Sequence, residues 1–205
     1  MDIFLIYPLL ALTSVVGLAF IVERGLALRW RNVLPPEIEA AVESCQTPAD
    51  VPMLRRVCAQ YASPMSRLLL MAADHLDWPK TDVVDALQSR ARHEITRLER
   101  GLIVLEIIVG IAPLLGLVGT ILGMMTAFGN VGQAGQIDPA ELAKGISLIL
   151  RATLLGLLIA IPSLIFWSYY TKKVESIAIE MESLCDEFIG RQYRGEEVRS
   201  LKSKV

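Results

Sequence analysis

The sequence predicts an all-α membrane protein with three transmembrane helices, the second and third of which extend into a cytoplasmic helical bundle. The first observation is composition: hydrophobic residues make up 53% of the 205 residues, and the mean hydropathy is +0.48. Soluble domains contain about 45–50% apolar residues. The second is that the apolar residues form three blocks separated by charged and polar segments. The third is block length, because about 20 apolar residues in a helix span a hydrocarbon core of roughly 30 Å and satisfy their own backbone groups.

The first block predicts transmembrane helix 1 within residues 1–22. Residues 3–22 carry no charge. A cleaved signal peptide is the alternative, but only Asp2 precedes the block, no Ala-x-Ala site follows it, and Glu23 and Arg24 come next. A signal peptide has a basic segment before its apolar core and a small-residue cleavage site after it. We therefore expect an uncleaved anchor.

Two further blocks predict transmembrane helix 2 at residues 102–128 and transmembrane helix 3 at residues 145–170, joined by a short turn at 129–144. The alternative is a set of buried helices in a large soluble core, but a chain of 205 residues has too little protein left to cover three such helices. The remaining segments, 23–101 and 171–205, are predicted as a cytoplasmic helical region and a cytoplasmic helical tail.

The distribution of lysine and arginine predicts the orientation in the membrane. Eleven of the 20 basic residues lie within 23–101, seven follow residue 171, and the 129–144 turn contains only Lys144. Basic residues accumulate in cytoplasmic segments. We therefore expect the N-terminus and the turn on the periplasmic side and the C-terminus in the cytoplasm. Three cysteines lie in the segments assigned to the cytoplasm, where thiols stay reduced: Cys45, Cys58 and Cys185.

Helical periodicity predicts how the polar segments fold. Short amphipathic helices are expected at 37–46, 51–62 and 63–76. From residue 81 onward, apolar residues recur at helical spacing up to the second block, so one long helix is expected to run unbroken into the membrane. The third block is expected to continue as a helix beyond residue 171, and these two long helices then form the cytoplasmic bundle.

No motif for catalysis, cofactor binding or nucleic-acid recognition is found in the sequence. The chain has no GxGxxG, Walker, HExxH or nucleophile-elbow sequence and no cysteine–histidine spacing typical of a metal site. Its two histidines, His75 and His93, are expected to be exposed or packed between helices. Basic residues are interspersed with acidic ones, unlike a nucleic-acid-binding surface. We therefore expect no enzyme activity, no cofactor, no metal and no nucleic-acid partner.

Small residues are concentrated in the second membrane block, in the stretch APLLGLVGTILGM at residues 112–124. Small residues permit close backbone approach between helices in lipid, and helix packing alone is one explanation of them. A similar stretch, GISLILRATLLGLLIAIP, occupies residues 145–162. The residues predicted to pack the helix bundle are Pro113, Gly116, Gly119, Gly123 and Gly156.

One threonine accompanies the glycines in each stretch. Thr120 and Thr153 both lie roughly nine residues from the outer ends of their helices, so antiparallel packing places them at similar depth, about 12–14 Å inward at 1.5 Å per residue. Two hydroxyls at one level are a candidate polar path for ions. The alternative is that each hydroxyl bonds a carbonyl one turn back in its own helix.

These two stretches resemble the MotA/TolQ/ExbB proton-channel family, with the ExbB/TolQ branch nearest. The resemblance covers the three-helix topology of nearly the whole chain and is sharpest over residues 98–170. It implies a homopentamer in the bacterial inner membrane, with an ExbD/TolR-like single-helix partner in a central pore. That partner's aspartate is then expected to carry the proton, and a TonB/TolA-like envelope protein to receive the force. By position, Thr120 and Thr153 match the family's pore threonines, whereas Leu148 replaces a family glutamate.

Two charged residues lie inside the predicted membrane helices, where charges often mark function. Glu106 precedes Thr120 by 14 residues, which is about 40° around the helix, so it points into the cytoplasmic end of the pore if Thr120 lines that pore. The alternative is that Glu106 pairs with a basic residue at the membrane surface. Arg151 lies two residues before Thr153, which is about 160° away from it around the helix axis. This angle favours a structural or subunit-interface role for Arg151 over a pore role.

The sequence therefore predicts the pore-forming subunit of a proton-driven motor that serves energy transduction or transport across the cell envelope. Threonine does not titrate at physiological pH, so the titrating group must come from the partner or from water. Sodium stays open as the transported ion, because hydroxyl and carbonyl oxygens also suit it. A non-conducting membrane scaffold is the alternative function. A flagellar-type stator subunit is less favoured, because such subunits have four membrane helices and a larger cytoplasmic loop.

Overall fold

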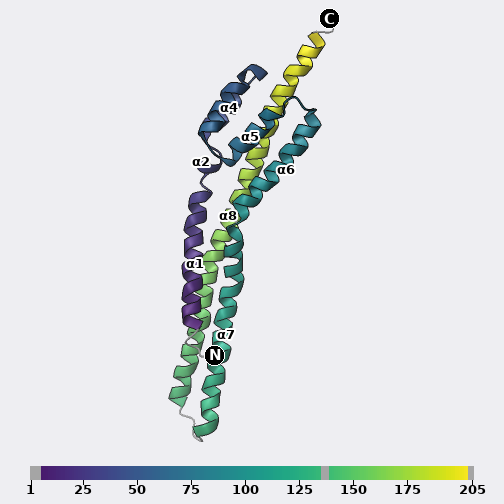
Figure 1. Ribbon diagram of the computed structural model, residues 1–205. Coiled ribbons are helices and arrows are strands. Elements are labelled where there is room, and N and C mark those ends of the chain that lie inside the picture. The colour runs from purple at the N-terminus through teal and green to yellow at the C-terminus, as the bar shows by residue number, and fades with distance from the viewer. Residues whose placement is uncertain (1–5, 135–138, 203–205) are drawn as a thin grey trace. The chain divides into compact units, whose positions relative to one another are not determined.

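The protein is described here from a computed structural model, which describes residues 6–134 and 139–202 (Figure 1). Within these residues the regular elements are helices, which confirms the all-α class. In chain order they are α1 (Ile6–Ala27), α2 (Trp30–Val33), α3 (Pro36–Ser44), the 3₁₀ helix η2 (Pro48–Asp50), α4 (Val51–Gln60), α5 (Pro64–Asp74), α6 (Lys80–Glu99), α7 (Leu102–Ala134) and α8 (Pro139–Lys202). Three segments are long and apolar enough to cross a membrane, as predicted: Ile6–Ala27, Leu102–Phe128 and Gly145–Arg194.

The chain divides into two compact units. The first, called the membrane unit below, consists of the residues up to Gly25 together with Arg100–Tyr170. The second, called the helical unit, consists of Leu26–Glu99 together with the residues from Thr171 onward. Helix α8 contributes its first part to the membrane unit and its second part to the helical unit.

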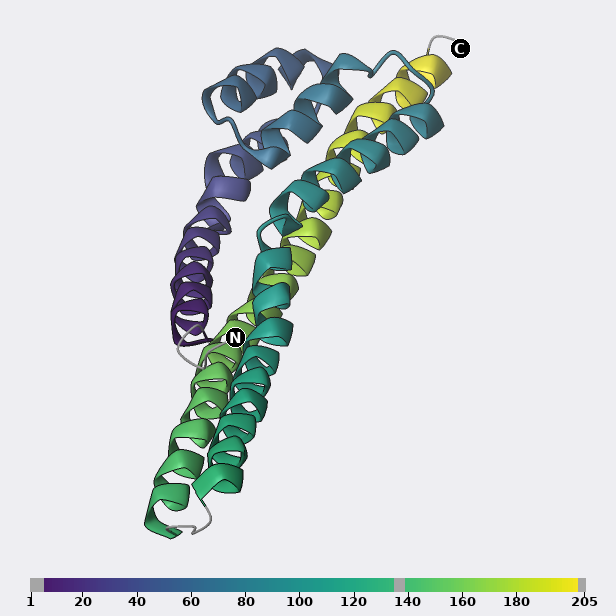
Figure 2. The ribbon, with the colours of Figure 1, turned by 60° about the horizontal axis from the view of Figure 1, so that its bottom comes forward.

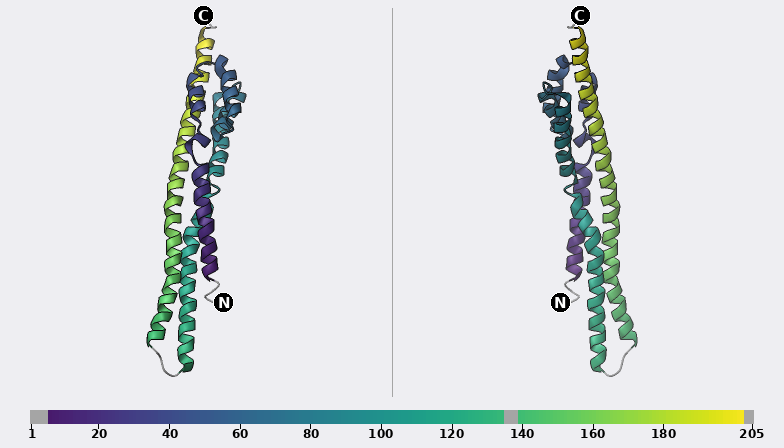
Figure 3. Two further views of the ribbon diagram at one scale, coloured as in Figure 1. Left: turned by 90° about the vertical axis from the view of Figure 1, so that its left-hand side faces the viewer. Right: turned by 90° about the vertical axis from the view of Figure 1, so that its right-hand side faces the viewer.

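In the membrane unit, α7 and the first part of α8 lie antiparallel and side by side (Figures 2 and 3). Helix α1 packs against both of them: a Cβ atom placed on Gly17 lies 3.4 Å from Ser163 Oγ of α8 and 3.5 Å from Ile108 Cδ1 of α7. Ile108, Ala112 and Ala160 form a small buried cluster in this unit. Small side chains at these contacts allow the three helices to approach one another closely.

The connection expected at residues 129–144 is partly helical. Helix α7 continues to Ala134 and α8 begins at Pro139. Residues 135–138, which belong to this expected turn, lie outside the described residues. Both membrane helices are therefore longer than their apolar blocks.

The prediction of one unbroken helix from residue 81 into the membrane is wrong. Helix α6 ends at Glu99 and α7 begins at Leu102, with a turn at Arg100 and Gly101 between them. Glycine in a helix interior is less favourable than alanine by about 1 kcal/mol. A Cβ atom placed on Gly101 would overlap Nε of Arg24, so a larger residue here would require that flexible side chain to move. The corresponding prediction for the third block is confirmed, since α8 continues without interruption to Lys202.

The helical unit has its own apolar core, formed by α3, α4, α5, α6 and the second part of α8. Side chains from α8 lie at its centre, with Ile177, Met181 and Phe188 almost fully buried. Helices α3, α4 and α5 confirm the three short helices expected from periodicity. The described cysteines Cys45, Cys58 and Cys185 are all free and buried.

A buried carboxylate connects α5 to α6 in the helical unit. The side chain of Glu94 is fully buried, and Arg67 donates to its two oxygens from Nε at 3.0 Å and from Nη2 at 2.5 Å. Arg97 and Arg90 lie 3.5 Å and 3.9 Å from Oε1 of the same carboxylate. The hydrogen bonds from Arg67 are the main reason that the pKa of Glu94 is lowered, against the opposing effect of burial.

We predict that Glu94→Gln lowers the free energy of unfolding by about 1–3 kcal/mol, because it leaves Arg67 without its anionic partner. The folded-state pKa of Glu94 is depressed, so its stabilisation is complete above the unfolded-state value near pH 4.3 and is lost as pH falls through the folded-state value. Chemical unfolding of the solubilised chain at several pH values measures this effect. Glu99→Gln on the same helix is the control, and an equal loss in both variants would contradict the prediction.

Candidate ion pathway at the α7–α8 helix pair

Reciprocal glycine contacts hold α7 and α8 together. A Cβ atom placed on Gly116 of α7 lies 2.9 Å from the carbonyl oxygen of Ala152 and 2.9 Å from Thr153 Cα. A Cβ atom placed on Gly156 of α8 lies 2.5 Å from the carbonyl oxygen of Ala112 and 3.3 Å from Gly116 Cα. Each glycine thus faces the backbone of the other helix. The predicted packing role of these two glycines is consistent with this geometry.

The next turn of α7 extends the same contact. A Cβ atom on Gly119 lies 2.8 Å from Ala152 Cβ and 3.5 Å from Ile6 Cγ2 of α1, and Gly123 is buried. Sequence reasoning missed Ala152 as a packing residue. The available signal was its spacing, since Ala152, Gly156 and Ala160 recur every four residues and all three are buried.

Both threonine hydroxyls donate to the same turn of α7. Thr120 Oγ1 donates to the carbonyl of Leu117 at 2.6 Å. For Thr120, the alternative of a hydrogen bond to a carbonyl one turn back in its own helix therefore holds. Thr153 Oγ1 instead donates across the helix pair to the carbonyl of Gly116 at 3.2 Å. The two acceptors are consecutive residues, and the structure therefore brings Thr120 and Thr153 to nearly one level. Their predicted similar depth agrees with this arrangement.

The shape of the pair makes the Thr153 bond possible. Because Gly116 has no side chain, the Thr153 backbone lies directly against α7, and its hydroxyl reaches the Gly116 carbonyl. Once both hydroxyl protons are donated to carbonyls, each threonine retains lone pairs that accept hydrogen bonds. This pair of side chains therefore offers hydrogen-bond acceptors, at half-buried positions, to a donor that approaches it.

Glu106 is exposed near the start of α7. It lies toward the same side of the helix as Thr120, since 14 residues leave the two about 40° apart. Pro113 lies between them, half-buried, and α7 continues through it although proline donates no hydrogen bond to the carbonyl of Val109. Glu106 is the one acidic residue in Leu102–Ala134.

Arg151 is exposed on α8 in the described chain. It lies two residues before Thr153, which places it on the side of α8 away from the contact with Gly116. Arg151 and Thr153 thus lie on different sides of α8. The side chain of Leu148, which replaces the family glutamate, lies outside the described part of the structure.

The fold and this site define an integral membrane protein with two long helices packed through glycines beside a pair of threonines. The model of the MotA/TolQ/ExbB proton channel family matches residues 60–183 of the chain. The chain therefore belongs to this family, and to its ExbB/TolQ-like branch.

Named relatives support the same branch. A biopolymer transport protein ExbB homologue of Methanothermobacter thermautotrophicus is 34% identical over 145 residues, which are 70% of this chain and 51% of the relative. Biopolymer transport protein ExbB of Aquifex aeolicus is 34% identical over 101 residues, 49% of this chain and 68% of the relative. ExbB of Helicobacter pylori is 40% identical over 81 residues, 40% of this chain and 56% of the relative. The chain thus spans about half the length of the first of these relatives.

Proposed function

We propose that this protein is the pore-forming subunit of a proton-driven motor in the bacterial inner membrane, with an ExbD/TolR-like partner as the moving part. The observation that carries the proposal is the convergence of the Thr120 and Thr153 hydroxyls on consecutive carbonyls of α7. Membership of a proton channel family supports it. The same hydroxyls and carbonyls also suit sodium, so the ion is part of the test.

The two threonines act on a titrating group supplied by the partner. Their protons are donated to α7, so they present lone pairs, which accept a hydrogen bond from a protonated carboxyl. When that carboxyl loses its proton, this hydrogen bond is lost and the carboxylate is no longer favoured at the site. The threonine pair thus favours the protonated partner group and releases the ionised one, which couples proton transfer to partner movement.

The assembly in this proposal is a homopentamer around the partner helix, with the N-terminus periplasmic and the C-terminus cytoplasmic. The biased distribution of lysine and arginine supports this orientation. Force is passed on to a TonB/TolA-like envelope protein. A large exposed apolar surface on α7 and α8, including Leu114, Ile121 and Leu158, suits contact with lipid and with neighbouring subunits.

The test is proton flux into vesicles that contain the protein with or without its single-helix partner. We expect flux that requires the partner and persists in sodium-free buffer. If the flux requires sodium, the transported ion in this proposal is sodium and not the proton. An assembled complex that supports function without any ion flux would establish the non-conducting scaffold instead.

We predict that Glu106→Gln lowers proton flux severalfold at low ionic strength. Several copies of an exposed carboxylate at the entrance of a pore attract cations, and salt screens this attraction over about 10 Å at 0.1 M. The difference between the variant and the wild type is therefore expected to shrink at high salt. Unchanged flux with normal assembly would remove Glu106 from the ion pathway.

A further inference from the structure

A pocket of about 670 Å³, called the basic pocket below, lies within the helical unit between α6 and the end of α5 with the loop that follows it. Its volume is in the range of small-molecule sites. The lining residues that carry the argument are Met71, His75 and Trp78 from α5 and the loop, and Arg90, Arg92 and His93 from α6. The proposed ion pathway uses none of these residues.

Both histidines of the chain line the basic pocket, although they lie in different elements. His75 Nδ1 lies 2.8 Å from the Met71 carbonyl oxygen, which can only accept, so Nδ1 donates to it. Within the described ranges, no group is hydrogen-bonded to His75 Nε2 or to the ring of His93, which is exposed. Imidazole donates from both nitrogens once it is protonated. The two rings therefore provide donors that the helical unit leaves unused.

The basic pocket is positively charged, because Arg90 and Arg92 line it and, among the described residues, no acidic side chain does. Arg90 Nε lies 3.9 Å from Glu94 Oε1, which is a long contact. Both oxygens of that carboxylate already accept shorter hydrogen bonds from Arg67. Glu94 therefore leaves the guanidinium of Arg90 largely available to another anion.

Arg92 is the least compensated cation of the basic pocket. It also borders a groove that contains Glu182 and Asp186. In the part of the chain that the structure describes, its guanidinium nevertheless forms no ion pair and donates no hydrogen bond. A guanidinium carries five N–H donors in a planar fork that matches the oxygens of a phosphate or carboxylate. Arg92 thus offers an unused site for such an anion.

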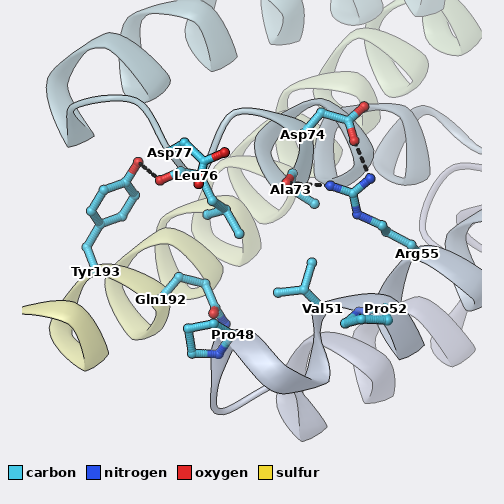
Figure 4. Close-up of a pocket in the computed structure, with 10 residues that line it drawn as sticks. All are labelled: Pro48, Val51, Pro52, Arg55, Ala73, Asp74, Leu76, Asp77, Gln192 and Tyr193. Carbon is cyan, nitrogen blue, oxygen red and sulfur yellow. Dashed lines mark hydrogen bonds and ion pairs between the residues drawn. The ribbon is translucent and has the colours of Figure 1, made fainter. Parts of the chain in front are cut away.

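A second pocket of the helical unit shows how its cation is compensated when acids are present (Figure 4). Arg55 donates from Nη2 to the Ala73 carbonyl at 2.8 Å and pairs through Nη1 with Asp74 Oδ1 at 2.6 Å. Asp77 lines this second pocket as well. The two acids closest to His75 in the sequence therefore line the second pocket and not the basic pocket.

Trp78 gives the basic pocket a flat apolar surface. The residue is 46% exposed, and its ring meets the ring of His75 in an edge-to-face arrangement with centroids 4.1 Å apart. Met71 lines the same pocket at a half-buried position. Aromatic rings pack favourably against other planar groups. A ligand that combines an anionic head with a flat body matches both parts of the lining.

We propose that the basic pocket binds a phosphate ester with a small, flat organic part. The phosphate oxygens accept hydrogen bonds from Arg90, Arg92 and the histidine rings, and the organic part packs against Trp78 and Met71. Phosphate suits this set of donors better than a carboxylate, because it offers more oxygens and a larger negative charge. This binding site goes beyond the proposed function and does not depend on it.

The experiment is a calorimetric titration of the full chain in neutral detergent with phenyl phosphate as the probe. Salt is held at about 0.15 M, where charges more than about 8 Å apart are screened. Benzoate, phenol and benzylammonium share the ring and differ in charge, so they serve as matched ligands. We expect saturable binding of phenyl phosphate, weaker binding of benzoate, and no binding of benzylammonium. No binding of phenyl phosphate, or equal affinity for phenol, would overturn the proposal.

Arg92→Gln is expected to weaken phenyl phosphate binding about tenfold, because it removes a charged donor to the phosphate. Arg56→Gln is the matched control, since Arg56 is exposed on α4 outside the basic pocket and its replacement removes the same charge. The control is expected to bind as the wild type does. Full affinity in Arg92→Gln, or an equal loss in Arg56→Gln, would overturn the proposal.

Trp78→Leu tests the flat surface separately. We expect severalfold weaker binding of phenyl phosphate and unchanged competition by inorganic phosphate, which has no ring. An equal loss for both ligands would overturn the assignment of the organic part to Trp78. The phosphate ester can be a soluble molecule or a lipid headgroup. Tighter binding of short-chain phosphatidylglycerol than of phenyl phosphate would assign the pocket to a lipid headgroup, and the reverse order to a soluble ester.

Discussion

Replacing Gly156 with alanine is expected to lower the free energy of unfolding by about 1–3 kcal/mol, although alanine is the better helix former by about 1 kcal/mol. The new Cβ atom lies 2.5 Å from the Ala112 carbonyl oxygen and 3.2 Å from its carbon. Backbone atoms of a neighbouring helix cannot rotate aside as a side chain can. Helices α7 and α8 must therefore separate, and the Thr153–Gly116 hydrogen bond between them lengthens or breaks.

Thermal unfolding of the solubilised protein, followed by circular dichroism, measures the effect of Gly156→Ala. Gly190→Ala is the matched control, because Gly190 lies in the same helix and a Cβ atom there meets nothing within 4 Å. The control is expected to be as stable as the wild type or slightly more stable. A Gly156→Ala variant as stable as Gly190→Ala would show that α7 and α8 do not pack as closely as described.

The sequence was sufficient for the positions of the membrane helices, because these follow from local composition, and its small residues pointed to Gly116, Gly119 and Gly156, which lie at close helix contacts, but not to Ala152. It did not show which glycine faces which neighbour. That register depends on the connection between α7 and α8 and on the fit of Ala112 and Ala152 into the opposing backbones. The hydroxyl of Thr153 bonds to Gly116 of the other helix for the same reason.

The break between α6 and α7 illustrates a second limit. Apolar residues at Leu98 and Leu102 keep helical spacing across it, so periodicity alone predicts continuity. The side chain of Arg24, a residue far away in the sequence, lies directly against Gly101 at this turn, a contact that periodicity does not reveal. The pairing of Glu94 with Arg67 likewise arises from long-range packing. No pattern of neighbouring residues in the sequence predicts such contacts.

Replacing Thr120 or Thr153 with valine is expected to lower partner-dependent proton flux severalfold, up to about tenfold, since a hydrogen bond to the neutral, protonated carboxyl of the partner contributes about 0.5–1.5 kcal/mol. Valine keeps the shape of threonine and deletes the hydroxyl. The two variants are expected to differ in stability. Thr153→Val removes a bond between helices, worth about 0.6 kcal/mol in a membrane, whereas Thr120→Val removes a bond within α7 and leaves the helix pair intact.

This difference separates an ion pathway from packing alone. Thr120→Val tests the hydroxyl with little change in packing, so a loss of flux in a complex of normal stability assigns Thr120 to the pathway. Thr153→Ser restores a hydroxyl to α8 and is expected to recover most of the flux that Thr153→Val loses. If both valine variants conduct like the wild type in assembled complexes, the threonines and glycines serve only to pack α7 against α8. If only Thr153→Val fails, and its loss of flux follows its loss of stability, the hydroxyl acts through helix packing and not on the ion.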